Sequence, residues 1–353
     1  MRPARALIDL AALRHNYLLA RSRHGGRALA VVKANAYGHG AVACATALAD
    51  VADGFAVACL EEAEILRAGG VAAPILLLEG IFEASELPRV DALGLWMVVH
   101  DASQLDMLAG FAPQRPLTVW LKFNTGMNRA GFVPARAREL YSALAADSRI
   151  ATIVMMTHLA RADEPDSDVS LVQWRRFREA VAGLPVPCSV CNSAGVLGWP
   201  QLRSDWARPG IMLYGADPMP GEGHGLRPVM TFDSRIMAIR ELQAGDPVGY
   251  GARFVAARPQ RIGLVAMGYA DGYPRVVPDG TPVTVDGRPS RIVGRVSMDM
   301  LTVDLDGIEA GLGSAVELWG VRVPVNRIAA AAGTIAYELL CNVKRARFEY
   351  VDD

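Results

Sequence analysis

A lysine at the end of an apolar run has the clearest capacity for chemistry in this sequence. The run Ala28–Val32 is typical of a short buried strand, and Lys33 follows it directly. In barrel-type α/β folds the carboxyl ends of the strands carry the catalytic groups. Desolvation at such a position favours the neutral amine, the form that makes a Schiff base with an aldehyde. The alternative is a structural lysine whose ammonium reaches solvent past the strand.

The residues that follow Lys33 suit a ligand site. Tyr37 offers a hydroxyl, and Gly38 and Gly40 let the backbone approach a bound molecule closely. Small residues from Ala41 to Leu48 then predict a helix. The sequence thus predicts a strand with the reactive lysine at its carboxyl end, followed by a helix.

Length and charge limit the classes of function. The chain has 353 residues, which predicts two domains, and 52% of them are apolar, enough for a large core. The formal net charge is -1 and no dense tract of lysine and arginine occurs, which argues against nucleic acid as an obligatory partner.

The N-terminus and the cysteines indicate a cytoplasmic protein. Asp9 interrupts the first residues before a long apolar region can form, so we expect neither a signal peptide nor a membrane span. Five scattered cysteines are typical of reduced thiols. Cys188 and Cys191 form one C-x-x-C pair, but no second pair or histidine cluster completes a zinc site, and we expect no metal.

Apolar runs alternate with helical stretches from residue 28 to about 225, close to eight times. Such near-continuously apolar strands suit a parallel sheet that is buried on both faces. No G-x-G-x-x-G fingerprint of a doubly wound dinucleotide fold appears, so we predict a (β/α)₈ TIM-type barrel.

A Pro/Gly-rich linker at 218–225 ends the barrel pattern. Short alternating segments with Asp-Gly turns follow it and predict a mainly β domain, with one helix at Val325–Ala332. We therefore expect a barrel domain at residues 1–225 and a β-rich domain at 226–353.

The segment Val31–Gly40 resembles the cofactor-lysine segment of the fold-type III pyridoxal-phosphate enzymes, most closely the alanine racemases. Further segments resemble the same family in the same order along nearly the whole chain. They are Leu121–Phe132, Met156–His158, Asn192–Ser193, Arg208–Gly215, Val248–Gly251, Gly268–Tyr273, Gly294–Asp299 and Gly333–Glu338.

The resemblance implies a pyridoxal 5'-phosphate enzyme that interconverts L-alanine and D-alanine with two bases. Lys33 would hold the cofactor covalently and move the α-proton on one face, and Tyr250 would do so on the other face. His158 would hydrogen-bond Tyr250 and contact Arg208. Arg208 would face the pyridine nitrogen, and because arginine only donates, that nitrogen would stay unprotonated. Without the resemblance, His158 is a structural histidine and Arg208 anchors a loop.

The resemblance also implies how the rest of the cofactor and the substrate would be held. Phosphate would be bound by hydroxyls and backbone N–H groups, namely those of Tyr37, Ser193, Gly210, Ile211 and Tyr337, with Asn192 nearby. Tyr337 is otherwise a partly buried core tyrosine.

Arg129 would bind the cofactor's phenolic oxygen or the substrate carboxylate. Lys122 resembles a lysine that is carbamylated in many relatives, which would turn a cation beside Arg129 into an anion. Asn124 departs from the aspartate of many relatives, which weakens inference about the local charge.

Three residues of the second domain would complete the site of a partner subunit. Tyr250 would reach the partner's cofactor, Met298 would approach the substrate carboxylate, and Tyr269 would lie near the entrance. This implies a homodimer with two shared sites. Asp299 would either hydrogen-bond near Tyr250 or cap a turn.

Three other functions remain open at this point. A racemase of another or broader amino-acid range shares the scaffold. Amino-acid decarboxylases of the same architecture would place an acidic residue at the pyridine nitrogen, where this sequence has Arg208. A pyridoxal-phosphate-binding protein without enzymatic activity resembles the barrel alone and would lack residues 226–353. We favour the racemase, supplying D-alanine for peptidoglycan or consuming it in catabolism.

Overall fold

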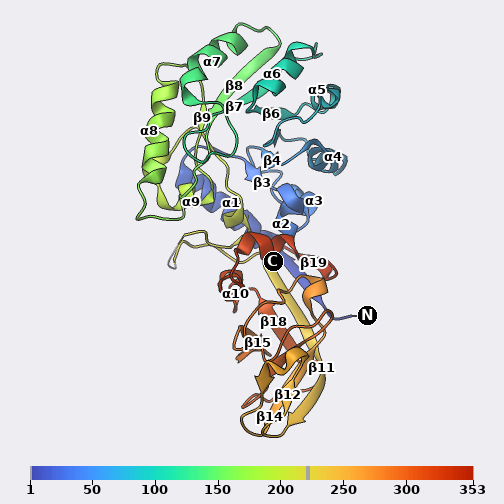
Figure 1. Cartoon of the computed structure of the whole chain (residues 1–353). Coiled ribbons are helices and arrows are strands. Elements are labelled where there is room, and N and C mark those ends of the chain that lie inside the picture. The colour runs from blue at the N-terminus through green and yellow to red at the C-terminus, as the bar shows by residue number, and fades with distance from the viewer. Residues whose placement is uncertain (1, 220–222, 353) are drawn as a thin grey trace.

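The computed structural model describes residues 2–219 and 223–352, and it has two parts, a barrel and a β-rich part (Figure 1). Residues 220–222 of the predicted linker lie outside the described residues. Among the described residues no helix is long and apolar enough to cross a membrane.

The barrel is built from parallel strands in the order β2-β10-β9-β8-β7-β6-β5-β4-β3. Their apolar residues are almost all buried, as expected of strands that are covered on both faces. The strands are β2 (Arg27–Ala28), β3 (Ala30–Val31), β4 (Phe55–Val57), β5 (Ile75–Leu77), β6 (Trp96–Val99), β7 (Leu117–Lys122), β8 (Ile150–Met156), β9 (Cys188–Ser189) and β10 (Trp206–Ala207).

One strand that is divided in two closes the barrel. Leu29 alone separates β2 from β3, so these two elements are halves of a single strand. The N–H of Leu29 donates to Ala207 on one side, and the N–H of Ala30 donates to Gly54 on the other, both at 2.9 Å. Counting the halves as one gives eight strands, which confirms the predicted (β/α)₈ barrel.

Helices cover the outside of the barrel strands (Figure 1). The main ones are α1 (Leu10–His24), α3 (Ala41–Ala47), α4 (Leu60–Ala68), α5 (Leu87–Ala92), α6 (Ala102–Ala109), α7 (Ala137–Ala145), α8 (Val169–Val181) and α9 (Ser193–Gly198). Trp96, Trp120 and Trp206 pack together with ring centroids between 5.7 and 6.1 Å apart. Aromatic pairs at these distances stabilise a core beyond the area that they bury.

The β-rich part is a mostly antiparallel sheet organised around the long strand β11 (Met230–Leu242). A separate pair, β12 (Pro247–Val248) and β13 (Phe254–Val255), lies beside it in sequence. The other strands are β14 (Gln260–Val265), β15 (Pro282–Val285), β16 (Arg288–Arg291), β17 (Leu301–Asp304), β18 (Ala315–Trp319) and β19 (Arg347–Val351). This part confirms the predicted mainly β character.

The first strand of the chain belongs to this sheet and not to the barrel. β1 (Arg5–Asp9) pairs antiparallel with β11 and parallel with β19. Arg5 forms ion pairs with Asp233 and Glu349 on these neighbours. The chain therefore enters through the β-rich sheet before it builds the barrel, a crossing that the predicted division at residue 225 does not include.

Two helices interrupt the β-rich part where the sequence predicted one. α10 (Val325–Ala332) agrees with the prediction, and α11 (Ala336–Cys341) follows it. Six residues are too few for a helical period to stand out in a sequence, and Gly333 ends α10 in the left-handed conformation just before them. The extra helix carries Tyr337 and Cys341.

The backbone after Lys33 turns in the left-handed sense. Within α2 (Lys33–Gly38), four residues from Ala34 to Tyr37 have φ between 51° and 55° and ψ between 42° and 50°. Left-handed helical geometry costs L-residues about 1–2 kcal/mol each, and none of these four is glycine. The surrounding structure must therefore hold this turn.

Buried histidines in the barrel lead us to expect instability in mild acid. Burial lowers the pKa of His39 from 6.5 to about 4 and lowers the pKa of His24 as well. Between these pKa values the unfolded chain binds protons that the folded chain does not bind. The contribution of these histidines to the free energy of unfolding is therefore fully present above about pH 6.5 and falls as the pH drops toward 4.

We predict that lowering the pH from about 7.5 to about 5 decreases the free energy of unfolding by on the order of 2 kcal/mol through His39 alone. Urea unfolding at both pH values would measure the difference. His39→Asn should flatten this dependence, and an unchanged slope in that variant would contradict the assignment.

Candidate active site

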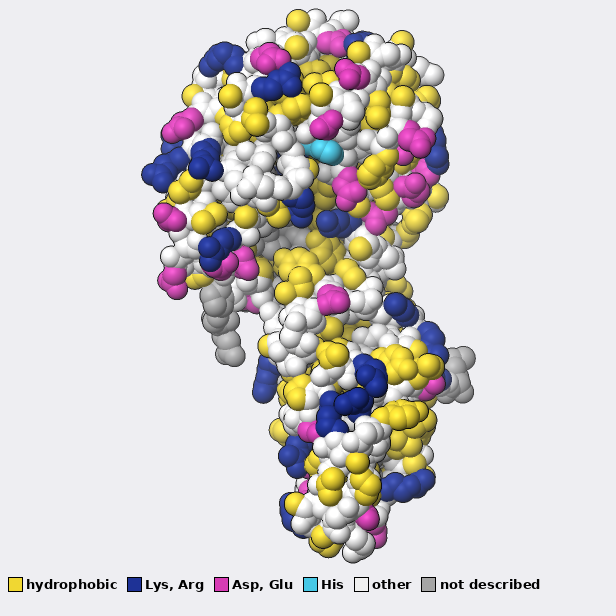
Figure 2. All heavy atoms as spheres, viewed as in Figure 1, with side chains coloured by type: hydrophobic (Ala, Val, Ile, Leu, Met, Phe, Trp, Pro, Cys, Tyr) yellow, Lys and Arg dark blue, Asp and Glu magenta, His cyan; other side chains and the backbone are white. Residues whose placement is uncertain are grey.

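The largest concentration of polar groups lines a cavity of about 650 Å³ at the carboxyl ends of the barrel strands. This volume lies within the range of about 300–1,000 Å³ that is typical of small-molecule sites. Figure 2 shows lysine and arginine side chains inside a hollow of the barrel part. Eleven of the site residues that the sequence analysis named line the cavity, namely Lys33, Tyr37, Lys122, Arg129, His158, Asn192, Ser193, Arg208, Gly210, Ile211 and, on α11, Tyr337.

Lys33 stands at the start of the left-handed turn, two residues past the end of β3. Its side chain is half-buried and lines the cavity. The position agrees with the expected strand end, and the turn that follows it was not predicted.

A cluster of hydroxyls and backbone N–H groups could hold a phosphate at one side of the cavity. The Oγ of Ser193 accepts hydrogen bonds from the N–H groups of Gly210 (2.9 Å) and Met212 (3.3 Å). A Cβ at Gly210 would lie 2.5 Å from the hydroxyl of Tyr37, so only glycine fits there. Burial raises the pKa of Tyr37 and raises that of Tyr337 to about 12, which keeps both hydroxyls as hydrogen-bond donors.

Arg208 is a buried cation at the floor of the cavity, with 4% of its surface exposed. Its guanidinium donates to the Oγ of Ser189 and, from Nη2, to the carbonyl of Thr157 at 2.7 Å and the Nδ1 of His158 at 3.3 Å. Burial lowers the pKa of Arg208 to about 10, so it stays protonated at neutral pH. The structure thus contains the contact between Arg208 and His158 that the family resemblance implies.

His158 is a neutral imidazole in this setting. Burial lowers the pKa of His158 well below 6.5, and the charges of Arg208, Arg129, Lys122 and Lys33 lower it further. Because Arg208 donates to Nδ1, the remaining proton of the ring lies on Nε2. His158 can therefore donate a hydrogen bond from Nε2 to an acceptor.

Lys122 ends β7 among other cations. Burial lowers the pKa of Lys122 to about 8, and the charges of Arg129, Arg208 and Lys33 contribute to the shift. Roughly a tenth of such an amine is neutral at pH 7. Glu79 is the one acidic residue among those that line the cavity.

Three predicted site residues do not line this cavity. Tyr250, Tyr269 and Met298 lie in the β-rich part with exposed fractions of 67%, 38% and 52%. Asp299 forms an ion pair with Arg345, and among the described residues its carboxylate has no hydrogen bond to Tyr250 and caps no turn.

Several residues that line the cavity escaped the sequence analysis. His100 directly follows β6, and Glu79 lies two residues past the end of β5. The rule that strand ends carry functional groups could therefore have identified both. Cys341 lies on the helix that was not predicted.

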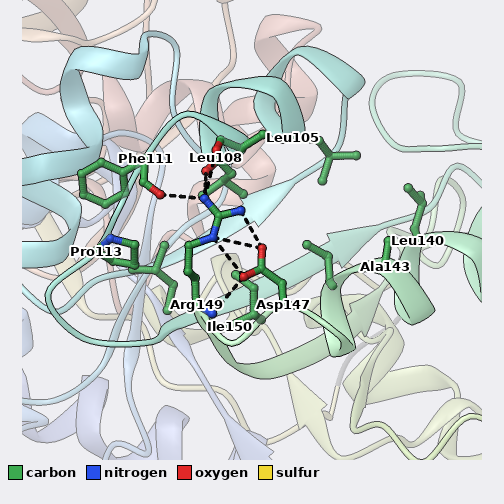
Figure 3. Close-up of a pocket in the computed structure, with 12 residues that line it drawn as sticks. Leu105, Leu108, Phe111, Pro113, Leu140, Ala143, Asp147, Arg149 and Ile150 are labelled. Carbon is green, nitrogen blue, oxygen red and sulfur yellow. Dashed lines mark hydrogen bonds and ion pairs between the residues drawn. The ribbon is translucent and has the colours of Figure 1, made fainter.

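A second, smaller cavity of about 200 Å³ lies where β7 and β8 begin, between α6 and α7. Apolar side chains line most of it, and its charged residues are Arg149 and Asp147 (Figure 3). The guanidinium of Arg149 donates to Asp147 and to the carbonyls of Leu108, Ala109 and Phe111. With these groups already paired, this cavity offers no reactive side chain. Among the described residues no group of three or more His, Cys, Asp or Glu is arranged to hold a metal ion.

The chain matches two family descriptions over nearly its whole length. Residues 8–218 match "Alanine racemase, N-terminal domain" and residues 229–351 match "Alanine racemase, C-terminal domain". Both parts of the structure are therefore accounted for by one family.

Curated proteins and solved structures agree with these matches. The alanine racemase of Azoarcus sp. (strain BH72) is 66% identical over 351 residues, which cover 99% of each chain. The structure of biosynthetic alanine racemase from Pseudomonas aeruginosa aligns with a TM-score of 0.96 and 47% identity, covering 99% of this chain and 100% of that one. The structure of alanine racemase from Bartonella henselae with covalently bound pyridoxal phosphate aligns with a TM-score of 0.90 and 30% identity, covering 99% and 100%. This chain belongs to the alanine racemase family.

Proposed function

We propose that this chain interconverts L-alanine and D-alanine by a two-base mechanism that uses pyridoxal 5'-phosphate. The observation that carries the proposal is the single cavity in which a lysine, a phosphate-type cradle and a buried arginine meet. A decarboxylase of the same architecture is disfavoured because Arg208, and no carboxylate, occupies the cavity floor. We also propose that the boundary between the two domains lies near residue 225.

The residues present fit this cofactor. The hydroxyls of Tyr37, Ser193 and Tyr337 and the N–H groups of Gly210 and Ile211 would bind its phosphate, for which the close approach at Gly210 leaves room. Lys33 would hold it covalently. The surplus of cations in the cavity, with Glu79 as the one acid, suits a ligand that carries a dianionic phosphate.

Pyridoxal phosphate, when bound, withdraws electrons from the Cα of an attached amino acid and so acidifies its proton. Lys33 would remove or return that proton on one face. Tyr250 would do so on the opposite face, because a single base tends to return the proton to the side from which it came.

His158 would act on the second base, Tyr250, and Arg208 would act on the ring nitrogen of the cofactor. The Nε2–H of His158 is a donor suited to a phenolate, which would help Tyr250 act as a base although an ordinary tyrosine has a pKa near 10. The Arg208 guanidinium has no acceptor and keeps its proton, so a ring nitrogen opposite it would stay unprotonated.

We propose that the active unit is a homodimer with two shared sites. Tyr250, Tyr269 and Met298 are exposed and do not line the cavity of their own chain, as expected of residues that serve a partner. The loops that carry Tyr269 and Met298 are tied together, since Tyr269 N–H donates to Ser297 and Ala270 N–H donates to Met298, both at 3.0 Å. Arg129 would bind the substrate carboxylate with Met298 and Tyr269 of the partner nearby.

The central test of the two bases is α-proton exchange in D₂O. We expect wild-type protein with pyridoxal phosphate to place deuterium at Cα of L-alanine and to form D-alanine. Tyr250→Phe should retain the cofactor and lose racemisation by about 10²- to 10⁴-fold, the usual worth of a general base. Lys33→Ala should lose the covalently held cofactor. NMR and chiral chromatography of one sample would measure both products.

Tyr141→Phe, on α7 and outside the cavity, is the matched control and should behave as the wild type. Racemisation by Tyr250→Phe at the wild-type rate would refute the role of Tyr250. Covalent cofactor retained in Lys33→Ala would refute the role of Lys33.

We also propose that Lys122 is carbamylated. The pKa of about 8 leaves enough neutral amine to react with CO₂, and the product would be an anion beside Arg129. We expect ¹³C-bicarbonate to give a carbamate NMR signal in the wild type that is absent in Lys122→Ala. Electron density for an unmodified amine in a crystal grown with bicarbonate would contradict this prediction.

A further inference from the structure

The turn that follows Lys33 has to be held in an unfavourable conformation by its neighbours. Ala34, Asn35, Ala36 and Tyr37 are all left-handed, and no glycine relieves the strain until Gly38. The turn carries Lys33 at its start and Tyr37 at its end, so any relaxation would move both side chains. The positions of both side chains therefore depend on the groups that hydrogen-bond the turn.

Glu62 holds the beginning of the turn from α4. One carboxylate oxygen accepts the N–H of Ala34 at 2.6 Å, and the other accepts the N–H of Ala58 at 2.8 Å. Ala34 is the residue after Lys33, and Ala58 directly follows β4. The carboxylate thus links the peptide group next to Lys33 to the neighbouring barrel strand.

His39 holds the end of the turn from within the core. Its Nδ1 lies 3.0 Å from the carbonyl oxygen of Ala36 and 2.9 Å from that of Tyr37. Both are acceptors, so Nδ1 carries the proton, and the buried Nε2 has no hydrogen-bond partner among the described residues.

The ring of His39 also packs beneath the turn. It stacks on Tyr214 with ring centroids 4.5 Å apart, and Tyr214 lies 4.8 Å from Tyr37 by the same measure. The hydroxyl of Tyr214 donates to the carbonyl of Val31 at 2.9 Å, on the strand that leads to Lys33. The ring of Tyr214 therefore limits the movement of the imidazole on the side away from the carbonyls of Ala36 and Tyr37.

We propose that Glu62 and His39 are positioning residues that keep the turn left-handed and so aim the amine of Lys33 and the hydroxyl of Tyr37 into the cavity. The inference rests on the proposed role of Lys33 in holding pyridoxal phosphate. Neither residue appears among those that line the cavity, so neither needs to touch the cofactor. Each acts through the backbone of the turn.

Glu62→Gln tests the first contact with the smallest change in shape. The amide retains one acceptor oxygen, and its NH₂ group faces the second backbone N–H, so one hydrogen bond is lost and the other is no longer charge-assisted. Hydrogen bonds to charged groups contribute enough for about a tenfold effect on a conformational equilibrium. Because a smaller competent fraction weakens apparent affinity in proportion, we expect the Kd for pyridoxal phosphate to rise by up to about tenfold.

Glu61→Gln is the matched control, since it makes the same change one residue away on the exposed side of α4. Titration of the apoprotein with pyridoxal phosphate, followed by its visible absorption, would measure the Kd. Hydrogen exchange at the amide of Ala34 gives a second readout, and we expect it to be faster in Glu62→Gln alone. Borohydride reduction and peptide mass would report the fraction of Lys33 that is linked to the cofactor.

His39 is tested by a pair of amide variants. His39→Asn places an amide donor where Nδ1 lies and should keep the Kd within about threefold of the wild type. His39→Gln places the amide where Nε2 lies, away from the carbonyls, and should raise the Kd about tenfold or more. A purely structural role predicts the reverse order or no difference, because glutamine fills more of the histidine volume than asparagine does.

The outcomes separate the proposal from the proposed function. Unchanged Kd and unchanged Ala34 exchange in Glu62→Gln, or equal Kd values for the two His39 variants, would overturn the positioning roles. Lys33→Ala that still linked the cofactor would instead overturn the proposed function. If His39→Gln does not fold, as judged by its thermal transition, the comparison of Glu62→Gln with Glu61→Gln still decides the proposal for Glu62.

Discussion

The structure depends on one strand and the backbone turn that ends it. Residues 27–31 close the barrel by hydrogen-bonding β10 on one side and β4 on the other. The chain then turns left-handed at Ala34–Tyr37, at a cost of about 1–2 kcal/mol per residue. A closed barrel can hold such a turn, because its neighbours are fixed by their own strand pairings. Strain of this kind is typical of functional sites.

The second constraint is electrostatic. Lys33, Lys122, Arg129 and Arg208 share one cavity with a single acid, Glu79. Burial lowers the pKa values of Lys122, His158 and Arg208, and the charges of neighbouring cations lower those of Lys122 and His158 further. A site of this kind is incomplete without bound negative charge. A phosphate and a carbamate are both anions, so each would relieve the same repulsion.

The sequence predicts the barrel, the β-rich part and the family, because apolar periodicity and family motifs are local patterns. It misses what depends on distant partners. The turn at Ala34–Tyr37 contains ordinary residues, and its contacts include Glu62 on α4 and Tyr214, which are distant from it in the sequence. The alternating sequence of β1 predicts a strand but does not indicate its partners, which are β11 and β19 in the second half of the chain. The roles assigned to Lys33 and Tyr250 remain predictions.

The exposure of Tyr250 is itself an argument about how such an enzyme is organised. A base on the second face of the substrate must approach from the open side of the cavity, which the barrel cannot cover with its own strands. The β-rich part is covalently attached to the barrel, yet its residues Tyr250, Tyr269 and Met298 are exposed and do not line the cavity of the same chain. The proposed two-fold dimer would resolve this, because an isologous pair would give each cavity the residues that do not line it within its own chain. In that dimer the barrel and the β-rich part would have distinct tasks, since one would hold the cofactor and the other would close the partner's site.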